Sequence, residues 1–453
     1  MSEVIENLPV IFPQFERKEL TLHTIYYLLC RMEKYKYINM VYNRKIDDFW
    51  SFRTADTKEF THCYHNYPAM MIPQVARQLL EEYAPKGKIE LVLDPYVGSG
   101  TTLVEASIKG IRSIGTDLNP LARFMSRVKN THYNIELVRE GIASITTGLF
   151  LYNPAEVINT DFSRISNYKF WYTEDSLYKL SYLNQLISEL YPSIQDFFLL
   201  CLSEVIREVS FTRNGEFKRY KMSEKQLEKF NPDVFYTFEK KVQRNLKGLE
   251  AFNEMGIDNL ASVYDFNTSN GIPSDIIKEN SVDIVVTSPP YGDSHTTVAY
   301  GQFSRWANEW FEFDNAKSID RLLMGGVISR EIRFNTQSIR SDLESIKELD
   351  EKRYYEVVSF LNDYWDSIQN VAKVIRKGGR VCYVVGNRRV KNIQINLDYF
   401  TAEMFEKCGF RHDITIVREI PNKRMPSKNS PTNKTGEKVT TMTNEYIVIL
   451  TKK

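Results

Sequence analysis

The sequence predicts an α/β protein in which an open, mostly parallel β-sheet is interrupted by a helical insertion. Short apolar runs that end at polar or acidic residues alternate with helical segments over residues 61–128 and again over 260–453. Such runs are typical of strands buried on both faces of a parallel sheet. Over residues 129–259 this alternation pauses, and apolar residues recur at helical spacing instead.

Length and composition fit a soluble protein with a sizeable core. The chain has 453 residues, of which 42% are hydrophobic and 26% charged, so global disorder is excluded. The net charge of +1 means that any contact with nucleic acid must come from local basic patches. The five cysteines are widely spaced, without the pairing expected for zinc or disulfides, and no metal site is predicted. With no apolar run of ~20 residues and no signal peptide, we expect a cytoplasmic protein.

The first 60 residues are predicted to form an N-terminal helical extension. A helix and a polar, aromatic connector fill residues 17–60 and carry no catalytic pattern. Residues 61–73 then form an aromatic lead-in that includes Tyr67 and Pro68, and a helix follows over residues 74–83. On its own, the segment over residues 61–83 is interpreted as a helix with an aromatic lead-in that contributes only to packing.

A glycine turn between strand and helix indicates an adenosine site. The strand over residues 89–94 ends in Asp94, and the turn that follows leads into a helix from residue 103. Glycines there allow close backbone approach, and the helix start offers free N–H groups. A second strand ends in Asp117, 19 residues after Gly98, about the offset at which a carboxylate meets ribose hydroxyls. The spacing does not separate a dinucleotide from S-adenosylmethionine. The site residues predicted on these two strand ends are Asp94, Pro95, Tyr96, Gly98, Gly100, Thr101, Thr102, Asp117 and Leu118.

A buried strand over residues 282–287 ends abruptly at Ser288-Pro289-Pro290-Tyr291. Open α/β sheets place ligands at the carboxyl ends of their strands. A serine hydroxyl, the Pro289 carbonyl and the flat Tyr291 ring together suit a planar base that carries an exocyclic amine. We expect a mobile loop over residues 292–304, and a loop or partly ordered cap over residues 314–350. An earlier strand near residues 262–263 ends at Asp265.

The remaining segments complete the sheet. A helix over residues 354–375 precedes a strand at 380–386, and a helix over 397–407 precedes strands at 412–419 and 445–450.

Two basic segments are candidates for contact with a phosphate backbone. One lies in the helical insertion over residues 213–221, and the other is a proline-rich loop over residues 421–434. For the first segment a solvated loop is the ordinary interpretation and phosphate contact is the alternative, whereas for the second, which has no acidic residue, phosphate contact is favoured. The predicted contact residues are Arg213, Lys218, Arg219, Lys221, Lys423, Arg424 and Lys428.

Asp-Pro-Tyr-Val-Gly-Ser-Gly-Thr-Thr at residues 94–102 and Ser-Pro-Pro-Tyr at residues 288–291 resemble the cofactor and catalytic motifs of the amino-methylating DNA methyltransferases, in the cytosine-N4 variant. The resemblance covers residues 61–128 and 260–451. It implies a Rossmann-like, seven-stranded mixed sheet that binds S-adenosylmethionine, and a bacterial or archaeal enzyme acting on double-stranded DNA beside a cognate restriction endonuclease.

The resemblance also implies roles for single residues. Tyr67 and Pro68 belong to the segment that closes over the cofactor, and Asp265 holds the usual place of a group that meets the adenine amine. Ser288, Pro289, Pro290 and Tyr291 form the catalytic corner. The insertion falls before Asp265 and not directly before the catalytic strand, which leaves the target-recognition region open, with residues 129–259 as a candidate.

Other functions fit the residues less well. An adenine-N6 enzyme would use the same corner, but acidic or amide residues accompany adenine in most of the family. An RNA base methyltransferase usually brings a separate RNA-binding module, which is not recognisable here. A dinucleotide oxidoreductase would need a third glycine in the turn. A catalytically silent nucleic-acid-binding module would not need intact cofactor and catalytic motifs.

Overall fold

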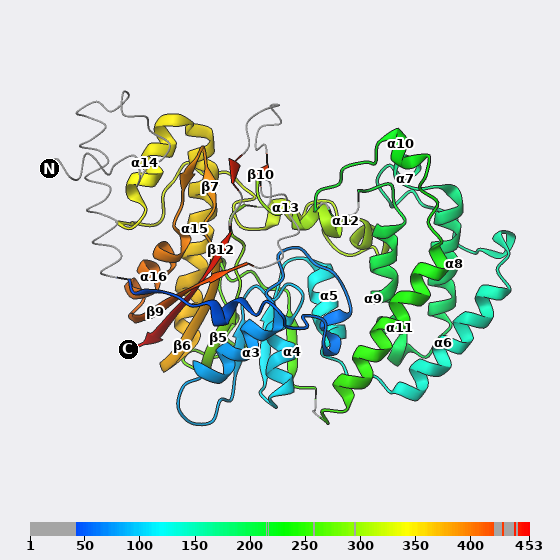
Figure 1. Cartoon of the computed structure of the whole chain (residues 1–453), viewed down its shortest axis with the longest axis horizontal. Coiled ribbons are helices and arrows are strands. Elements are labelled where there is room, and N and C mark those ends of the chain that lie inside the picture. Colours follow the sequence, from blue (N-terminus) through cyan, green and yellow to red (C-terminus); the bar gives the residue numbers. More distant parts are fainter. Residues whose placement is uncertain are drawn as a thin grey trace.

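The computed structural model describes residues 42–420 except 214, 216, 257, 258, 294 and 295, the backbone of 428–429 and 439–440, and residues 443–453. A sheet covered by helices lies at one end of the long axis, and a group of helices lies at the other (Figure 1). The helix predicted near the N-terminus lies outside the described residues.

The sheet has eight strands in the order β1-β9-β12-β6-β5-β2-β3-β4. Five neighbours, β6, β5, β2, β3 and β4, are parallel, and β12 runs antiparallel to both β6 and β9. All seven predicted strands are present, so the predicted mixed α/β sheet is confirmed. The eighth, β1, pairs in parallel with β9 and lies in the segment predicted to be a connector. The strand bounds are β1 Arg44–Ile46, β2 Val92–Asp94, β3 Ser113–Thr116, β4 Ala261–Tyr264, β5 Val282–Thr287, β6 Ile375–Gly386, β9 Phe410–Glu419 and β12 Asn444–Lys452.

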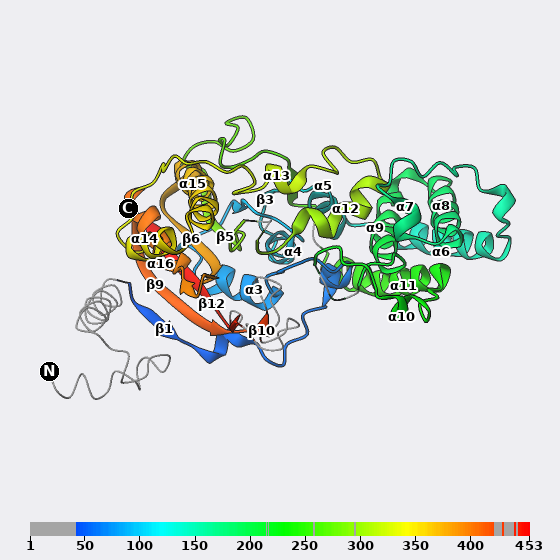
Figure 2. The ribbon, with the colours of Figure 1, turned by 90° about the horizontal axis from the view of Figure 1, so that it is seen from above.

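Helices cover both faces of the sheet, as its apolar strands require (Figure 2). Along β5, Ile284 and Val286 face a core shared with α3, whereas Val285 faces the core on the opposite side. This alternation follows from the period of two along a strand. The first face carries α3 Pro73–Glu82 and α4 Thr101–Ile108, and the second carries α14 Arg340–Leu349, α15 Glu351–Val374 and α16 Leu397–Lys407. The helix α14 contradicts the loop or cap predicted for residues 314–350.

The second group of helices has a core of its own, which includes Leu177, Leu180 and Leu183 from one face of α8. Two further helices, α5 and α12, contribute to this core, and α5 also contacts β4 of the sheet. Because α12 starts at Tyr300, the end of the loop predicted over residues 292–304 is helical. The bounds are α5 Pro120–Lys129, α6 Ile135–Phe150, α7 Tyr168–Trp171, α8 Glu174–Ser188, α9 Pro192–Glu208, α10 Glu224–Leu227, α11 Val234–Asn253, α12 Tyr300–Trp310 and α13 Ile319–Leu322.

Short elements complete the described chain. These are the 3-10 turns η1 Asp48–Ser51, η2 Phe60–Cys63 and η3 Pro154–Glu156, and the two-residue strands β7 Arg389–Val390, β8 Ile393–Gln394, β10 Lys428–Asn429 and β11 Val439–Thr440. Within the described ranges, no helix combines the length and apolar character needed to span a bilayer.

Candidate active site

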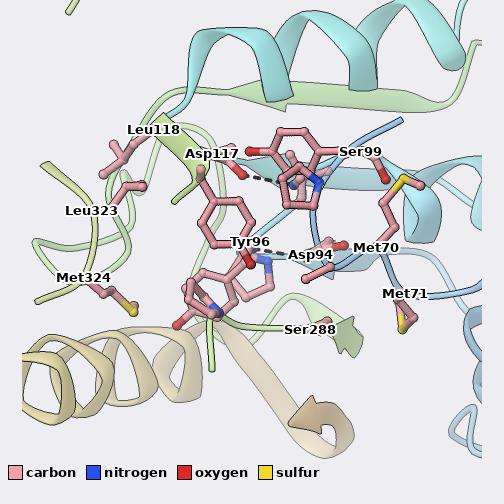
Figure 3. A pocket seen from close by; sticks show the side chains of 18 of the residues that line it. Met70, Met71, Asp94, Tyr96, Ser99, Asp117, Leu118, Ser288, Leu323 and Met324 are labelled. Carbon is pink, nitrogen blue, oxygen red and sulfur yellow. Dashed lines mark hydrogen bonds between the residues drawn. The ribbon is translucent and has the colours of Figure 1, made fainter. Parts of the chain in front are cut away.

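A cavity opens at the carboxyl ends of β2, β3, β4 and β5 (Figure 3). Parallel strands place their carboxyl ends at one edge of the sheet, so residues far apart in sequence meet there. Leu323 and Met324 lie on the opposite side of the cavity from Met70 and Met71. The lining consists of Tyr67, Pro68, Ala69, Met70, Met71, Asp94, Pro95, Tyr96, Val97, Gly98, Ser99, Thr101, Asp117, Leu118, Phe266, Asn267, Thr268, Ser288, Pro290, Tyr300, Leu323 and Met324.

The glycine turn after β2 needs its glycines for two reasons. Gly98 and Gly100 have φ of +48° and +79°, a backbone region that side chains disfavour. A Cβ on Gly100 would also lie 2.6 Å from the Oγ atom of Ser126 in α5. The buried Lys129 donates to the Ser99 carbonyl at 3.0 Å, and burial lowers the pKa of this lysine to about 7. Helix α5 therefore supports the turn from behind.

Asp117 directly follows β3, and its side chain contacts the glycine turn after β2. Its carboxylate accepts hydrogen bonds from the N–H of Gly98 at 3.0 Å and from the N–H of Asn119 at 2.8 Å. Burial raises the pKa of Asp117 above its usual value, against the lowering effect of these two donors. The carboxylate is thus fixed in orientation while it borders the cavity.

Asp94 joins the two strands that carry the predicted motifs. Its Oδ1 atom accepts from the hydroxyl of Thr287, the last residue of β5, at 2.6 Å, and from the N–H of Tyr96 at 3.2 Å. Burial raises the pKa of Asp94 to about 6. Thr102 is buried and donates its hydroxyl to the Val286 carbonyl at 3.1 Å. The glycine turn and Ser288 therefore stand in a fixed relation.

Ser288 lines the cavity, and a chain of hydrogen bonds extends behind it. The Ser288 Oγ atom lies 3.1 Å from the hydroxyl of Tyr291, which donates to Glu445 Oε1 at 2.9 Å. Arg418 donates to the other oxygen of Glu445 at 2.7 Å. Burial raises the pKa of Tyr291 well above its usual value, so the phenol is protonated. Pro289 is buried, and Pro290 borders the cavity.

Aromatic side chains close one side of the cavity. Tyr67 packs against Tyr300 of α12 with ring centroids 5.7 Å apart. Asn119 donates to the hydroxyl of Tyr67 at 3.0 Å and to Ser304 at 2.6 Å. The lead-in segment, the end of β3 and α12 are thereby held together over the glycine turn.

Most residues predicted for the cofactor and catalytic sites lie together, but not all of them. Those that border the cavity are Tyr67, Pro68, Asp94, Pro95, Tyr96, Gly98, Thr101, Asp117, Leu118, Ser288 and Pro290. Gly100 and Thr102 instead support the turn, and Tyr291 stands behind Ser288. Asp265 directly follows β4, is exposed and lies outside the described lining, to which the next three residues, Phe266, Asn267 and Thr268, contribute.

Several lining residues were not predicted. Met70, Met71, Val97 and Ser99 lie inside segments that the motifs had marked, so their neighbours in sequence could have indicated them. Leu323 and Met324 come from the region assigned to a loop or cap, and carry no sequence signal of their own.

The first basic segment is docked on the helical part of the molecule. The guanidinium of Arg219 lies over the ring of Trp306 at 4.7 Å, and the Lys221 ammonium lies over Phe170 at 3.7 Å. Arg213 is exposed, whereas Lys218 is half-buried. In the second segment, Lys423 and Arg424 fall outside the described residues, and for Lys428 only the backbone is described.

The parallel strands and the cavity at their carboxyl ends are those of an α/β protein that binds a nucleotide-like cofactor. A family model for N6/N4 DNA methylases matches residues 16–123. The type II methyltransferase M.MvaI of Kocuria varians is 39% identical over 435 residues, which cover 90% of this chain and 95% of that protein. This chain therefore belongs to the type II DNA methyltransferases of the N6/N4 class.

More distant similarities accompany this one. The type II methyltransferase M.BsoBI of Geobacillus stearothermophilus is 22% identical over 451 residues and covers 84% of each chain. Among solved structures, the rRNA methyltransferase aviRa of Streptomyces viridochromogenes matches with a TM-score of 0.31 and 10% identity, covering 85% of this chain and 88% of that one.

S-adenosylmethionine is the cofactor of this family and of this chain. The residues present fit it. The cavity offers a carboxylate at Asp117 for hydroxyl groups, aromatic and thioether side chains for an adenosyl group, and a glycine turn that admits close backbone approach.

Proposed function

We propose that this protein transfers a methyl group from S-adenosylmethionine to the exocyclic N4 amine of a cytosine flipped out of duplex DNA. The observation that supports this most directly is that Ser288, in Ser-Pro-Pro-Tyr at the end of β5, borders the same cavity as Gly98 and Asp117. Methylation of a specific site would protect host DNA from a cognate restriction endonuclease.

Asp117 would hold the ribose of the cofactor, and the residues of the glycine turn would face its amino-acid part. Tyr67 and Pro68 would close over the turn, where α12 already supports Tyr67 through Tyr300. When bound, S-adenosylmethionine supplies an electrophilic methyl group. The protein must keep water out of the cavity, and the apolar Leu323 and Met324 on its far side suit that task.

Ser288 and the Pro289 carbonyl would accept hydrogen bonds from the two hydrogens of the target amine. The lone pair of such an amine is delocalised into the ring, so the nitrogen is a poor nucleophile. Two acceptors at fixed positions favour the tetrahedral form in which the lone pair is available. Because these hydrogen bonds strengthen as the amine attacks, they act mainly on turnover. The reaction then depends on positioning and needs no covalent enzyme adduct.

The target base must leave the helical stack before it reaches Ser288. Extruding a base costs about a few kcal/mol, part of which stacking on an aromatic ring can return. Tyr291 is the ring that the catalytic motif provides. Its hydroxyl is already bonded on both sides, to Ser288 and to Glu445, which fixes the position of the ring.

DNA would contact exposed basic side chains between the sheet and the helical group. Of the first basic segment, Arg213 is exposed, whereas Arg219 is engaged with Trp306 on α12. We therefore assign Arg213 to phosphate contact and Arg219 to holding the segment on α12 beside the cavity. Lys423, Arg424 and Lys428 remain proposed contacts of the second segment.

The choice of N4-cytosine rests on the serine at position 288. Mass spectrometry of nucleosides tests it, on genomic DNA that the purified protein has methylated and that comes from a host lacking it. We expect N4-methylcytosine. Exclusive N6-methyladenine would contradict the base assignment and leave the amine chemistry in place, whereas modification of RNA in place of DNA would contradict the substrate.

A further inference from the structure

Behind Ser288, a chain of four side chains crosses from the catalytic corner to the antiparallel part of the sheet. Ser288 contacts Tyr291, Tyr291 contacts Glu445 of β12, and Glu445 contacts Arg418 of β9. Glu445 and Arg418 are directly opposite each other in the antiparallel ladder. The Arg418 side chain is 3% exposed and that of Glu445 is 16% exposed, so water competes little for these contacts.

The direction of each hydrogen bond in this chain follows from the chemistry of its members. Glu445 forms an ion pair with Arg418 and, as a carboxylate, can only accept hydrogen bonds. Tyr291 must therefore donate its one hydrogen to Glu445. Its oxygen is then an acceptor toward Ser288, so the Ser288 hydroxyl donates to Tyr291.

We infer that Glu445, held by Arg418, is a positioning residue that fixes the Ser288 hydroxyl as a hydrogen-bond acceptor toward the substrate amine. This rests on the proposed role of Ser288. A serine hydroxyl has one hydrogen and two lone pairs. With its hydrogen committed to Tyr291, both lone pairs remain for the N–H groups of an amine, and the hydroxyl cannot turn to donate to the nitrogen that must attack.

The Ser-Pro-Pro-Tyr motif alone does not indicate which residues orient the Ser288 hydroxyl. Glu445 lies 154 residues after Tyr291 and comes next to it only because β12 inserts between β6 and β9. An acceptor at position 445 and a cation at position 418 are thus part of the catalytic corner, although neither belongs to the cavity lining described above.

Glu445→Gln tests the inference with little change of shape. Arg418 requires an oxygen opposite it, so the amide would present its NH₂ group to Tyr291 and reverse the chain of hydrogen bonds. Single-turnover methyl transfer from radiolabelled S-adenosylmethionine to unmodified genomic DNA should slow by about tenfold, the scale of one hydrogen bond. Affinities for cofactor and DNA, measured by calorimetry and anisotropy, should stay unchanged.

Glu419→Gln is the matched control. Glu419 follows Arg418 on β9, is opposite Asn444 in the same ladder, and forms an exposed ion pair with Arg53. It does not belong to the chain behind Ser288, so transfer should proceed at the normal rate.

Tyr291→Phe interrupts the same chain and keeps the Arg418 ion pair. If Glu445→Gln fails to fold, this single variant tests the inference: transfer should slow by about tenfold, and a normal rate would overturn it. The double variant Glu445→Gln/Tyr291→Phe should be no slower than Tyr291→Phe alone, because Glu445 acts through the tyrosine hydroxyl. Multiplying losses in the double variant, or a normal rate in Glu445→Gln, would overturn the inference. Ser288→Ala distinguishes a failure of the proposed function from a failure of the inference about Glu445. Full activity in Ser288→Ala would overturn the role of Ser288 itself, and the inference with it.

Discussion

Two buried acids, one at the sheet edge and one in the helical group, are held in opposite ways. Asp94 is surrounded by neutral donors, namely the Thr287 hydroxyl and the Tyr96 N–H, and burial raises its pKa to about 6. Burial acts in the same direction on Glu204 of α9, but the charges of His65, Arg244 and Lys241 outweigh it and lower the pKa to about 2.

His65 adds little to this balance near neutral pH, because burial lowers its own pKa to about 4. Arg244 and Lys241, at 2.8 and 3.3 Å from Glu204, supply the compensating charge. The difference teaches that the charge of Glu204 is matched by neighbouring cations, whereas Asp94 and Asp117, which border the cavity, remain available to a ligand. The variants below test that difference.

The largest effect is expected for Glu204→Gln. Removing one member of a buried ion pair leaves the cations uncompensated, so the free energy of unfolding should fall by ~3 kcal/mol near neutral pH. Because folding lowers the pKa of Glu204, its contribution is present above about pH 4.5 and is lost as the pH falls toward 2. Chemical denaturation across that range measures it. Glu136→Gln removes an exposed ion pair with Arg139 and should change stability by less than ~1 kcal/mol; equal losses in both variants would contradict the account.

Asp117→Ala should weaken S-adenosylmethionine binding by about 1–3 kcal/mol, since it removes a half-buried acceptor that borders the cavity. Calorimetry measures the change. Asp265→Ala is the comparison, because Asp265 is exposed and outside the described lining. A larger loss of cofactor affinity in Asp265→Ala than in Asp117→Ala would support the sequence-based prediction that Asp265 contacts the cofactor and would contradict the assignment to Asp117.

Asp94→Asn should alter the pH dependence of stability in the opposite sense from Glu204→Gln. Folding raises the pKa of Asp94 from 3.8 to about 6, so its contribution is fully present below about pH 4 and is lost as the pH rises through 6. The slope from one such group is at most ~1.4 kcal/mol per pH unit. Denaturation midpoints measured from pH 4 to 7 should decline less in Asp94→Asn than in the unmodified protein. The same pH profile in both proteins would contradict the burial of Asp94 among neutral donors.

The smallest effect is expected where two arginines of one segment are compared. Arg213→Ala should lower the salt dependence of DNA binding by about one counterion, because an exposed cation would neutralise one phosphate. Arg219→Ala should leave that slope intact and reduce stability by ~1 kcal/mol, through loss of its contact with Trp306. Anisotropy titrations at several salt concentrations separate them, and the reverse pattern would exchange the two roles.

The strand ends could be predicted from the sequence because local pattern determines them. An apolar run that stops at Asp94 or at Ser288 places the polar residue at the sheet edge wherever the strand is inserted. The partners of those residues could not be predicted, since strand order brings them together: Glu445 reaches Tyr291, and Leu323 reaches the cavity, only in the folded sheet. The contact of Arg219 with Trp306 could not be predicted either, because a run of basic residues does not reveal which aromatic ring will lie beside each of them.

The central claim is that Ser288 is the acceptor for the target amine. It is tested most directly by the single-turnover rate of methyl transfer to DNA in Ser288→Ala, with S-adenosylmethionine affinity measured on the same preparation. We predict a rate lower by on the order of a hundredfold, with unchanged cofactor affinity, as for the loss of a group that acts in the transition state. A wild-type rate, or a loss that follows weaker cofactor binding alone, would contradict the claim.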